Sequence, residues 1–298
     1  MPRRALVGPA RLFFLGLAVF STASYLPGMS VVFYDTHAHL DYPDFAAELS
    51  AVVQRAAEAG IERLISIGTD LESSRQAIAL AERFPAVYAV VGWHPNDALT
   101  APADIRPALR ELAKHPKVVA IGETGLDYFR LPSANGGTVA EDDVLKQKQA
   151  EIFQQQLEVA AETGLNAVIH TRGDCFEQTL AIMEPFTSKV RGVFHCFVND
   201  TACMQRVLAM NSIISFTGIL TFKNAQIIRD TLAATPMGSF MLETDSPFLA
   251  PVPYRGKRCE PAYVKEISEA AAKVKNCSLE ELSAATCKTA HEFFHRLR

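Results

Sequence analysis

Residues 31–40 read Val-Val-Phe-Tyr-Asp-Thr-His-Ala-His-Leu, an apolar run that leads into an acidic residue and two histidines. In an open, doubly wound α/β sheet, the first strand is followed by a glycine-rich loop that cradles phosphate. Here Asp35, His37 and His39 follow the run, and no glycine stands among them. The catalytic residues of a (β/α)₈ barrel instead stand at the C-terminal ends of the strands. The stretch therefore favours a barrel over the doubly wound sheet.

Seven further short apolar runs lie downstream of this one. Most of them are apolar throughout rather than alternating, as expected for parallel strands that helices cover on the outside. Seven of the eight runs are rich in β-branched residues, which favour strands. The eight predicted strands are residues 31–36, 63–67, 87–92, 118–122, 166–169, 192–194, 212–216 and 240–243.

Patterns of helical periodicity fill the intervals between these runs. The longest pattern stops at Gly164, a natural helix C-terminus, and the last begins after Ser278, which forms a capping-box pattern with Glu281. We expect residues 131–143 to be a long loop after the fourth strand. The predicted helices are residues 45–59, 72–84, 105–114, 145–163, 175–183, 201–210, 225–233, 261–274 and 279–296. The alternation predicts a single-domain (β/α)₈ TIM barrel of the α/β class over residues 29–298.

The bulk composition fits one such domain. The chain has 298 residues, 49% of them hydrophobic, and barrels of this kind run to about 250 residues. The formal net charge is −4, whereas a protein that grips nucleic acid broadly through its phosphates is usually basic. Any contact with nucleic acid should therefore be confined to an active site. The six cysteines form no Cys-x-x-Cys pair, which indicates free thiols in a reducing compartment. We therefore predict a cytoplasmic protein. We also expect it to be a monomer.

The first 28 residues are predicted to lie outside the fold. Arg3 and Arg4 precede an apolar run over residues 12–20, and Ser21-Thr-Ala resembles a cleavage site, as in a secretory signal. The run is too short to span a membrane comfortably, so we expect no stable membrane association. Met29 stands just before the first predicted strand, and a start there would leave a complete domain. We favour that start over a true signal peptide.

Predicted metal ligands, all of them histidines or carboxylates, stand where five of the eight predicted strands end. These residue types bind divalent cations. Every histidine from position 37 to position 195 except His115 lies at a strand end. The predicted metal ligands are His37, His39, Glu123, His170, His195 and Asp245.

The spacing and chemistry of these residues suggest their roles. His37 and His39 are two apart on an extended segment, so their side chains point the same way and can reach one cation. Glu123 can bridge two cations with one oxygen on each. His170 and His195 complete the ligands of the second cation. Asp245 can bind a cation and also accept a proton from the attacking water. We therefore predict two divalent cations (Mg²⁺, Mn²⁺ or Zn²⁺), with Glu123 and Asp245 as the catalytic residues.

Other residues near the strand ends are candidates for supporting roles. Asp35 either orients an imidazole or makes a strand-end hydrogen bond, and the sequence favours neither. Arg172 carries a planar guanidinium suited to phosphate. The predicted substrate-binding residues are His94, Arg172, Tyr128 and Arg255. Weaker candidates near the same pocket are Lys257, Arg258 and Asp127, with Phe197 and Phe222 for stacking a base.

Seven short motifs stand at or near the ends of the predicted strands. They are Asp35-Thr-His-Ala-His-Leu, Gly92-Trp-His-Pro, Ile121-Gly-Glu-Thr-Gly-Leu-Asp-Tyr, Ile169-His-Thr-Arg, His195-Cys-Phe, Ser215-Phe-Thr-Gly and Glu243-Thr-Asp-Ser-Pro-Phe-Leu-Ala-Pro. Taken together, they resemble the motifs of the TatD family of metal-dependent deoxyribonucleases. They occur in family order, the resemblance covers residue 31 to about residue 296, and as a set they are highly specific. The resemblance implies a barrel, two cations on the six ligands named above, and hydrolysis of DNA phosphodiester bonds, often as a 3′→5′ exonuclease.

The chain departs from the family's pattern at three places. Cys259 stands where the family usually has asparagine, Val198-Asn replaces a common Thr-Gly or Ser-Gly, and Gly173-Asp-Cys follows the strand-end arginine. None of these positions is a predicted ligand. The departures therefore bear on substrate preference rather than on the metal chemistry.

Two alternatives to a nuclease stay open at this stage. The same two-metal site would serve a hydrolase of an amide, a lactone or an aminoacyl ester. Glu123 stands where many amidohydrolases carry a carbamylated lysine, which favours a phosphodiesterase. A non-catalytic metal-binding protein is the third hypothesis, and the presence of all six ligands speaks against it. The negative charge and a concave barrel mouth favour single-stranded DNA ends as the substrate.

Overall fold

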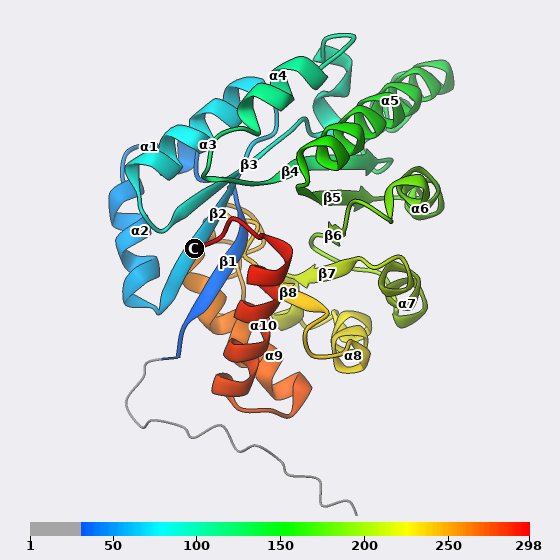
Figure 1. The fold of residues 1–298 in the computed structure, drawn as a ribbon. Helices are drawn as coiled ribbons and strands as arrows, with labels where there is room; N and C mark the ends of the chain where they lie inside the picture. Colours follow the sequence, from blue (N-terminus) through cyan, green and yellow to red (C-terminus); the bar gives the residue numbers. More distant parts are fainter. Residues whose placement is uncertain (1–30) are drawn as a thin grey trace, which may run out of the picture. The chain divides into compact units, whose positions relative to one another are not determined.

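A computed structural model of the chain describes residues 31–298, and the predicted leader, residues 1–28, lies outside the described residues. At the centre is one sheet of eight strands, each paired in parallel with the next in the order β1 to β8 (Figure 1). The strands are β1 Phe33–Ala38, β2 Ile61–Ile67, β3 Val87–Val91, β4 Val118–Asp127, β5 Asn166–Arg172, β6 Gly192–Phe194, β7 Ile213–Phe216 and β8 Phe240–Leu242. The predicted (β/α)₈ barrel is confirmed.

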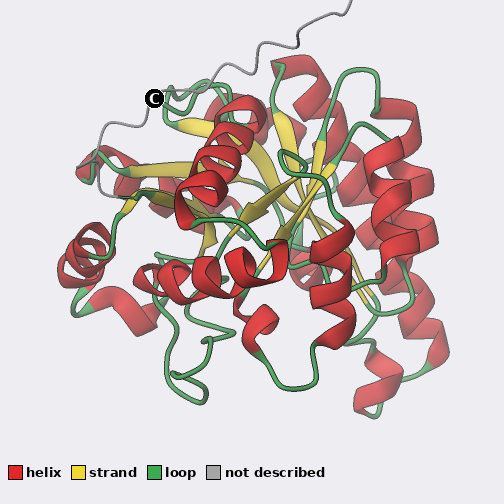
Figure 2. Ribbon diagram, turned by 90° about the horizontal axis from the view of Figure 1, so that it is seen from below, coloured by secondary structure: helices red, strands yellow, loops and turns green. Residues whose placement is uncertain are grey.

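Helices surround these strands on the outside, as Figure 2 shows from below. They are α1 Pro43–Ala46, α2 Leu49–Glu58, α3 Leu71–Arg83, α4 Arg106–Leu112, α5 Val139–Thr163, α6 Phe176–Met183, α7 Thr201–Ala209, α8 Gln226–Ala234, α9 Val264–Lys275 and α10 Leu279–Phe293. Five short 3₁₀ helices complete the described part: η1 Pro95–Thr100, η2 Pro132–Asn135, η3 Glu184–Phe186, η4 Gly218–Thr221 and η5 Pro261–Tyr263.

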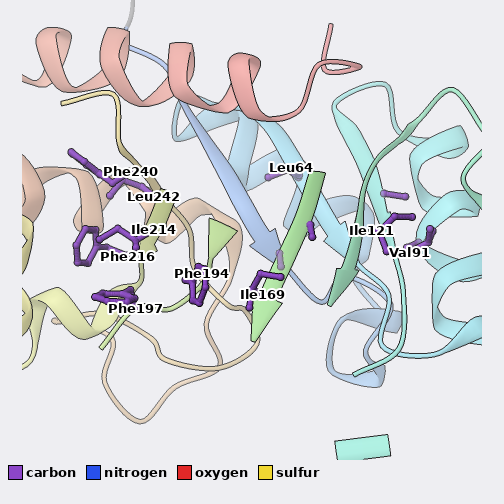
Figure 3. Close-up of a cluster of buried hydrophobic side chains, with 14 of the residues drawn as sticks. Leu64, Val91, Ile121, Ile169, Phe194, Phe197, Ile214, Phe216, Phe240 and Leu242 are labelled. Atoms are coloured by element: carbon purple, nitrogen blue, oxygen red, sulfur yellow. The ribbon is translucent and has the colours of Figure 1, made fainter. Parts of the chain in front are cut away.

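The strands are apolar on both faces because each face packs against a different layer. In β6, for example, Val193 belongs to the cluster inside the barrel, whereas Phe194 belongs to the cluster between the sheet and the helices. β7 repeats the pattern with Ile213 inside and Ile214 outside. Figure 3 shows several of the outward side chains. This two-sided burial explains why the sequence showed continuous apolar runs instead of alternation.

The C-terminal segment closes the barrel at the N-terminal ends of the strands. Phe293 and Phe294 are fully buried and pack into the cluster inside the barrel. Arg296 donates from Nη1 to the carbonyl oxygens of Ala113 and Val118, 2.8 and 3.1 Å away. The opposite end, where the C-terminal strand ends lie, is left for the functional site.

Three predicted boundaries were wrong for local reasons. α5 begins at Val139, inside the expected loop, because Thr138 and Glu141 form a capping box that the sequence analysis did not use. The predicted first helix is two helices, α1 and α2, since the helical backbone is interrupted at Ala47 and Glu48. β4 continues past Glu123 to Asp127, paired with β5 as far as Arg172.

The seam between β8 and β1 is closed mainly by side chains and by a single bridge between Ala38 and Ser246. Asp35, which is fully buried, accepts hydrogen bonds from the backbone N–H and the hydroxyl of Thr244 at 2.9 and 2.6 Å. Burial raises the pKa of Asp35 to about 8. Of the two roles considered for Asp35, the structure shows the strand-end hydrogen bond.

Two further expectations concern the chain as a whole. The six cysteines are free thiols, as predicted. Among the described residues, every helix is too short or too polar to cross a lipid bilayer.

Because the Asp35 carboxyl group helps to close the seam, its removal should destabilise the fold. Asp35→Ala leaves the Thr244 N–H buried without its partner, so the free energy of unfolding in urea should fall by about 1–3 kcal/mol. The control is Asp143→Ala at an exposed position of α5, which should change the free energy of unfolding by less than about 0.5 kcal/mol. Equal unfolding free energies for Asp35→Ala and wild type would show that the seam does not depend on this carboxyl.

Candidate metal centre

The six predicted ligands converge on one cluster at the C-terminal end of the barrel. Glu123 lies at its centre and is 2% exposed. Its position depends on Gly122, because a Cβ there would stand 2.7 Å from the carbonyl oxygen of Val168 on β5. Only glycine lets β4 lie this close to β5, and the close approach directs Glu123 into the barrel mouth.

One oxygen of Glu123 faces the end of β1. His37 Nε2 lies 3.3 Å from Glu123 Oε2, and His39 Nε2 lies 3.7 Å from it. Asp245, just after β8, places Oδ1 3.7 Å from the first imidazole and 3.4 Å from the second. The backbone N–H of Asp245 donates to the carbonyl of His37, so the seam itself sets this spacing.

The other oxygen of Glu123 faces the later strands. His170 Nδ1 and His195 Nε2 lie 2.8 and 2.7 Å from Glu123 Oε1. His94, predicted to bind substrate, lies here too, with Nε2 3.4 Å from the same oxygen. Its Nδ1 accepts from the N–H of Asn96, which aims Nε2 at the cluster. His94 therefore joins the groups of side chains that could hold a metal ion.

Three such groups share members around Glu123. They are His37 with Glu123 and His195, His37 with His39 and Asp245, and His94 with Glu123 and His170. In each group the candidate ligand atoms lie within 4.8 Å of one another.

Two buried carboxylates orient the histidines from outside. Asp127 Oδ2 lies 3.1 Å from His170 Nε2, and Glu243 Oε1 lies 3.6 Å from His195 Nδ1. Such outer partners set the tautomer and direction of a metal-binding imidazole. Sequence reasoning missed Glu243. Its position two residues before Asp245, at the end of a strand, was the available signal.

The charges of the cluster stabilise one another. Burial alone raises the pKa of Glu123, but the imidazoles of His195, His94 and His37 hold it well below its usual range. Burial lowers the pKa of His195, yet the Glu123 carboxylate beside it raises that pKa well above the usual value. The pKa of Asp245 is also lowered, mainly by a hydrogen bond from His39, against the effect of burial. Both carboxylates are thus anionic, as metal ligands must be.

Several buried polar atoms in this cluster have no hydrogen-bond partner among residues 31–298. They are both ring nitrogens of His37, Nδ1 of His39, Oε2 of Glu123 and Nδ1 of His195. Unpaired buried polar groups are costly and rare. Imidazole nitrogens and carboxylate oxygens facing one another are a donor set suited to divalent cations, so these residues fit a metal.

The cluster forms the floor of a cavity of about 710 Å³. Of the predicted substrate-binding residues, His94 and Arg172 line this cavity, and Tyr128 and Arg255 do not. The lining also includes Arg130, Tyr42 and Phe248, which sequence reasoning did not select. They lie several residues beyond their strands, in loops whose direction no local pattern reveals.

The candidates outside the cavity have other partners. The Tyr128 hydroxyl donates to Gln178 on α6 at 2.6 Å. Arg255 lies over the ring of Phe222, 3.6 Å from its centroid. Arg258 is paired with Glu48. Phe197, a candidate for stacking a base, is instead 5% exposed and packs in the core beside Phe194 (Figure 3).

Comparison with known proteins agrees with this geometry. The sequence model of the family described as TatD related DNase matches residues 34–295. The chain is 36% identical over 262 residues to the uncharacterized metal-dependent hydrolase YabD of Bacillus subtilis, covering 88% of this chain and 98% of that protein. It is 36% identical over 240 residues to the 3′-5′ ssDNA/RNA exonuclease TatD of Enterobacter lignolyticus, covering 78% of this chain and 88% of the relative. The crystal structure of YjjV, a TatD homolog from Escherichia coli, superposes with a TM-score of 0.80 at 26% identity, over 88% of this chain and 98% of that one.

A parallel barrel with this histidine–carboxylate cluster at its C-terminal strand ends is a metal-dependent hydrolase. The chain belongs to the TatD family.

The proximity of Glu123 and His195 predicts a measurable titration. In metal-free protein, burial lowers the pKa of His195, but the carboxylates of Glu123 and Glu243 raise it to well above 6.5. The stabilisation from this imidazolium is therefore present at low pH and lost as the pH rises through the raised pKa. A ¹³C or ¹⁵N NMR titration with chelator should show the raised value. Glu123→Gln should lower it, and Glu111→Gln on the surface of α4 should not. A wild-type value at or below 6.5 would contradict the assignment.

Proposed function

We propose that this protein hydrolyses DNA phosphodiester bonds, removing nucleotides from the 3′ ends of single strands with the help of two divalent cations. The observation that carries the proposal is the two-sided position of Glu123. Its Oε2 faces His37 and His39, and its Oε1 faces His170 and His195. A relative named a 3′-5′ ssDNA/RNA exonuclease supports the choice of substrate.

The residues of the cluster would hold the cations in two sets. We assign His37, His39 and Asp245 to one set and His170 and His195 to the other, with Glu123 shared, because one oxygen of Glu123 faces each set. His94 lies close enough to contribute to the second set. When bound, divalent cations polarise phosphoryl oxygens and lower the pKa of water from near 16 towards about 7.

Asp245 is the residue we assign to proton transfer. It lines the cavity, and its Oδ1 lies beside the imidazoles of His37 and His39. A hydrogen bond from His39 lowers the pKa of Asp245 against the effect of burial, so the carboxylate is ionised before the reaction. A general base must be deprotonated at the working pH, and this carboxylate is.

Arg172 and Arg130 supply the positive charge for substrate phosphates. Both line the cavity, and both are exposed at its edge. Guanidinium groups bind phosphate oxygens through two parallel hydrogen bonds, which positions the strand as well as attracting it. No lysine lines the cavity within residues 31–298, so the carbamylated lysine of many amidohydrolases has no equivalent there.

Removing the central carboxylate should abolish both metal binding and activity. Glu123→Ala should lower the metal content and reduce hydrolysis of bis-p-nitrophenyl phosphate by roughly 100-fold or more, since even an outer partner of a metal ligand is worth 10- to 100-fold. Elemental analysis and circular dichroism measure the metal and the fold. Glu111→Ala, an exposed position on α4, is the matched control and should behave as wild type. Full metal content with normal turnover in Glu123→Ala would rule out the shared-ligand role.

Digestion should begin at a chain end. The net charge of −4 and the small number of arginines at the cavity provide no broad surface for a duplex. A linear single strand should be degraded, and a covalently closed circle of the same sequence should resist. Equal cutting of both would show an endonuclease.

The affinity for single-stranded DNA should depend only weakly on salt. With two to four phosphate contacts, the log–log salt slope of binding should be roughly −1.4 to −2.8. A slope steeper than about −5 would indicate a broad basic surface in addition to the arginines at the cavity.

A further inference from the structure

Aromatic side chains line the cavity on the side of β8 and β1. Tyr42 follows β1 and Phe248 follows β8, and their ring centroids lie 5.7 Å apart at 87°. Tyr42 also stacks on His39, 5.0 Å away at 30°. Phe248 is 48% exposed, which is unusual for a phenyl ring beside a buried cluster. Its open face lies within the cavity wall.

The backbone that carries Phe248 is firmly held. Its N–H donates to the carbonyl of Asp245 at 2.9 Å, and the N–H of Val252 donates to the Thr221 hydroxyl at 2.9 Å. Gly218 packs against the same loop so closely that a Cβ there would stand 2.2 Å from the carbonyl oxygen of Leu249. The exposure of Phe248 is therefore a property of a fixed loop. Flat aromatic faces presented in this way are the platforms on which nucleobases stack.

The positive charge lies on the other side of the cavity. Among residues 31–298, the arginines and lysines that line the cavity are Arg130 and Arg172. Arg130 follows β4, and Arg172 is the last residue of β5. Neither guanidinium forms an ion pair within this part of the chain, whereas Arg258 is paired with Glu48. Arg172 rests on the ring of Phe129, 4.3 Å from its centroid, which supports it without neutralising it.

The topology sets these two walls opposite each other. In a barrel with strand order β1 to β8 and a seam between β8 and β1, the pair β4–β5 stands diametrically across from that seam. Glu123 and its imidazoles lie between the two walls. The aromatic wall also carries the Asp245 carboxylate, which would repel a further phosphate.

We propose that this polarity orients the substrate: the base of the 3′-terminal nucleotide stacks on Phe248, which Tyr42 contacts nearly at right angles, and the next phosphate in the 5′ direction binds Arg172 and Arg130. The inference rests on the proposed nuclease function and adds the direction in which the strand crosses the barrel mouth. The scissile phosphate then lies over the metal cluster. The rest of the strand leaves over the β4–β5 wall, where its charge is compensated.

The aromatic wall is tested with a base deletion in the substrate and a ring deletion in the protein. The substrates are a 5′-labelled single-stranded oligonucleotide and the same oligonucleotide with a tetrahydrofuran residue at its 3′ end. Wild type should cleave the base-free end roughly 5- to 100-fold less efficiently in kcat/KM, the range expected for one stacked base. Phe248→Ala should cleave the two oligonucleotides with kcat/KM values within about twofold of each other. Both values should match that of wild type on the base-free oligonucleotide. Phe248→Trp should keep the preference.

Leu99→Ala is the matched control, because Leu99 is an exposed apolar residue of the same end of the barrel that does not line the cavity. It should keep the wild-type preference. An unchanged preference in Phe248→Ala would overturn the stacking assignment while leaving the nuclease function standing. Slow cleavage of the base-free end by Phe248→Ala would also overturn it, because the ring would then support the site rather than the base. Failure of wild type to cleave either oligonucleotide with Mg²⁺, Mn²⁺ or Zn²⁺ would instead refute the proposed function.

The guanidinium wall is tested with an uncharged linkage. A methylphosphonate at the phosphate on the 5′ side of the scissile one should raise KM for wild type roughly 10-fold, since one charged contact is lost. The double variant Arg130→Ala/Arg172→Ala should be insensitive to this replacement and should keep the full preference for a terminal base. Equal sensitivity of wild type and the double variant would show that the strand leaves the cavity in another direction.

Discussion

The hydrogen bonds from Thr244 to Asp35 are the contacts on which the geometry of the site depends. A parallel barrel must join its last strand to its first, and among residues 31–298 the backbone does so through one bridge, between Ala38 and Ser246, and the hydrogen bonds from Asp245 N–H to His37 and from His39 N–H to Ser246. The buried Asp35 carboxyl accepts both the N–H and the hydroxyl of Thr244 and so sets the register of β8 against β1. His37 lies two residues after Asp35, and Asp245 directly follows Thr244. The spacing between those two side chains is therefore a consequence of barrel closure.

The same closure makes a buried cluster of ionisable groups tolerable. Burying unpaired charge is expensive, and each imidazole and carboxylate here would be costly alone. Around Glu123 they are paired so closely that the carboxylate is held ionised against burial. Within the described residues, His37 Nε2 and Glu123 Oε2 lie 3.3 Å apart and neither has a hydrogen-bond partner, so a cation could bind between them. The rigid strands prevent these side chains from relaxing into other pairs.

The two ends of the barrel have separate tasks. Phe293, Phe294 and Arg296 close the N-terminal end with apolar packing and with hydrogen bonds to the loop before β4. The C-terminal end carries polar side chains at the strand ends and on the loops that follow them, and a cavity remains there. Because the stabilising contacts lie mostly below the site, the loops above it can differ between relatives without unfolding the barrel. The departures of this chain from the family pattern, such as Val198, lie in that upper layer.

The sequence by itself determined the barrel and the side chains that meet in the candidate metal cluster. Parallel strands covered on both faces produce continuous apolar runs, and the chemistry at their ends is local, so His37 or Glu123 could be recognised from its neighbours in the chain. Only the tertiary structure decided which more distant residues share the cavity. Arg172 enters it whereas Arg255 rests on Phe222, and Phe248 presents its ring whereas Phe197 is buried. These outcomes depend on loop direction and on packing between segments far apart in sequence, and no periodicity in the chain encodes either of them.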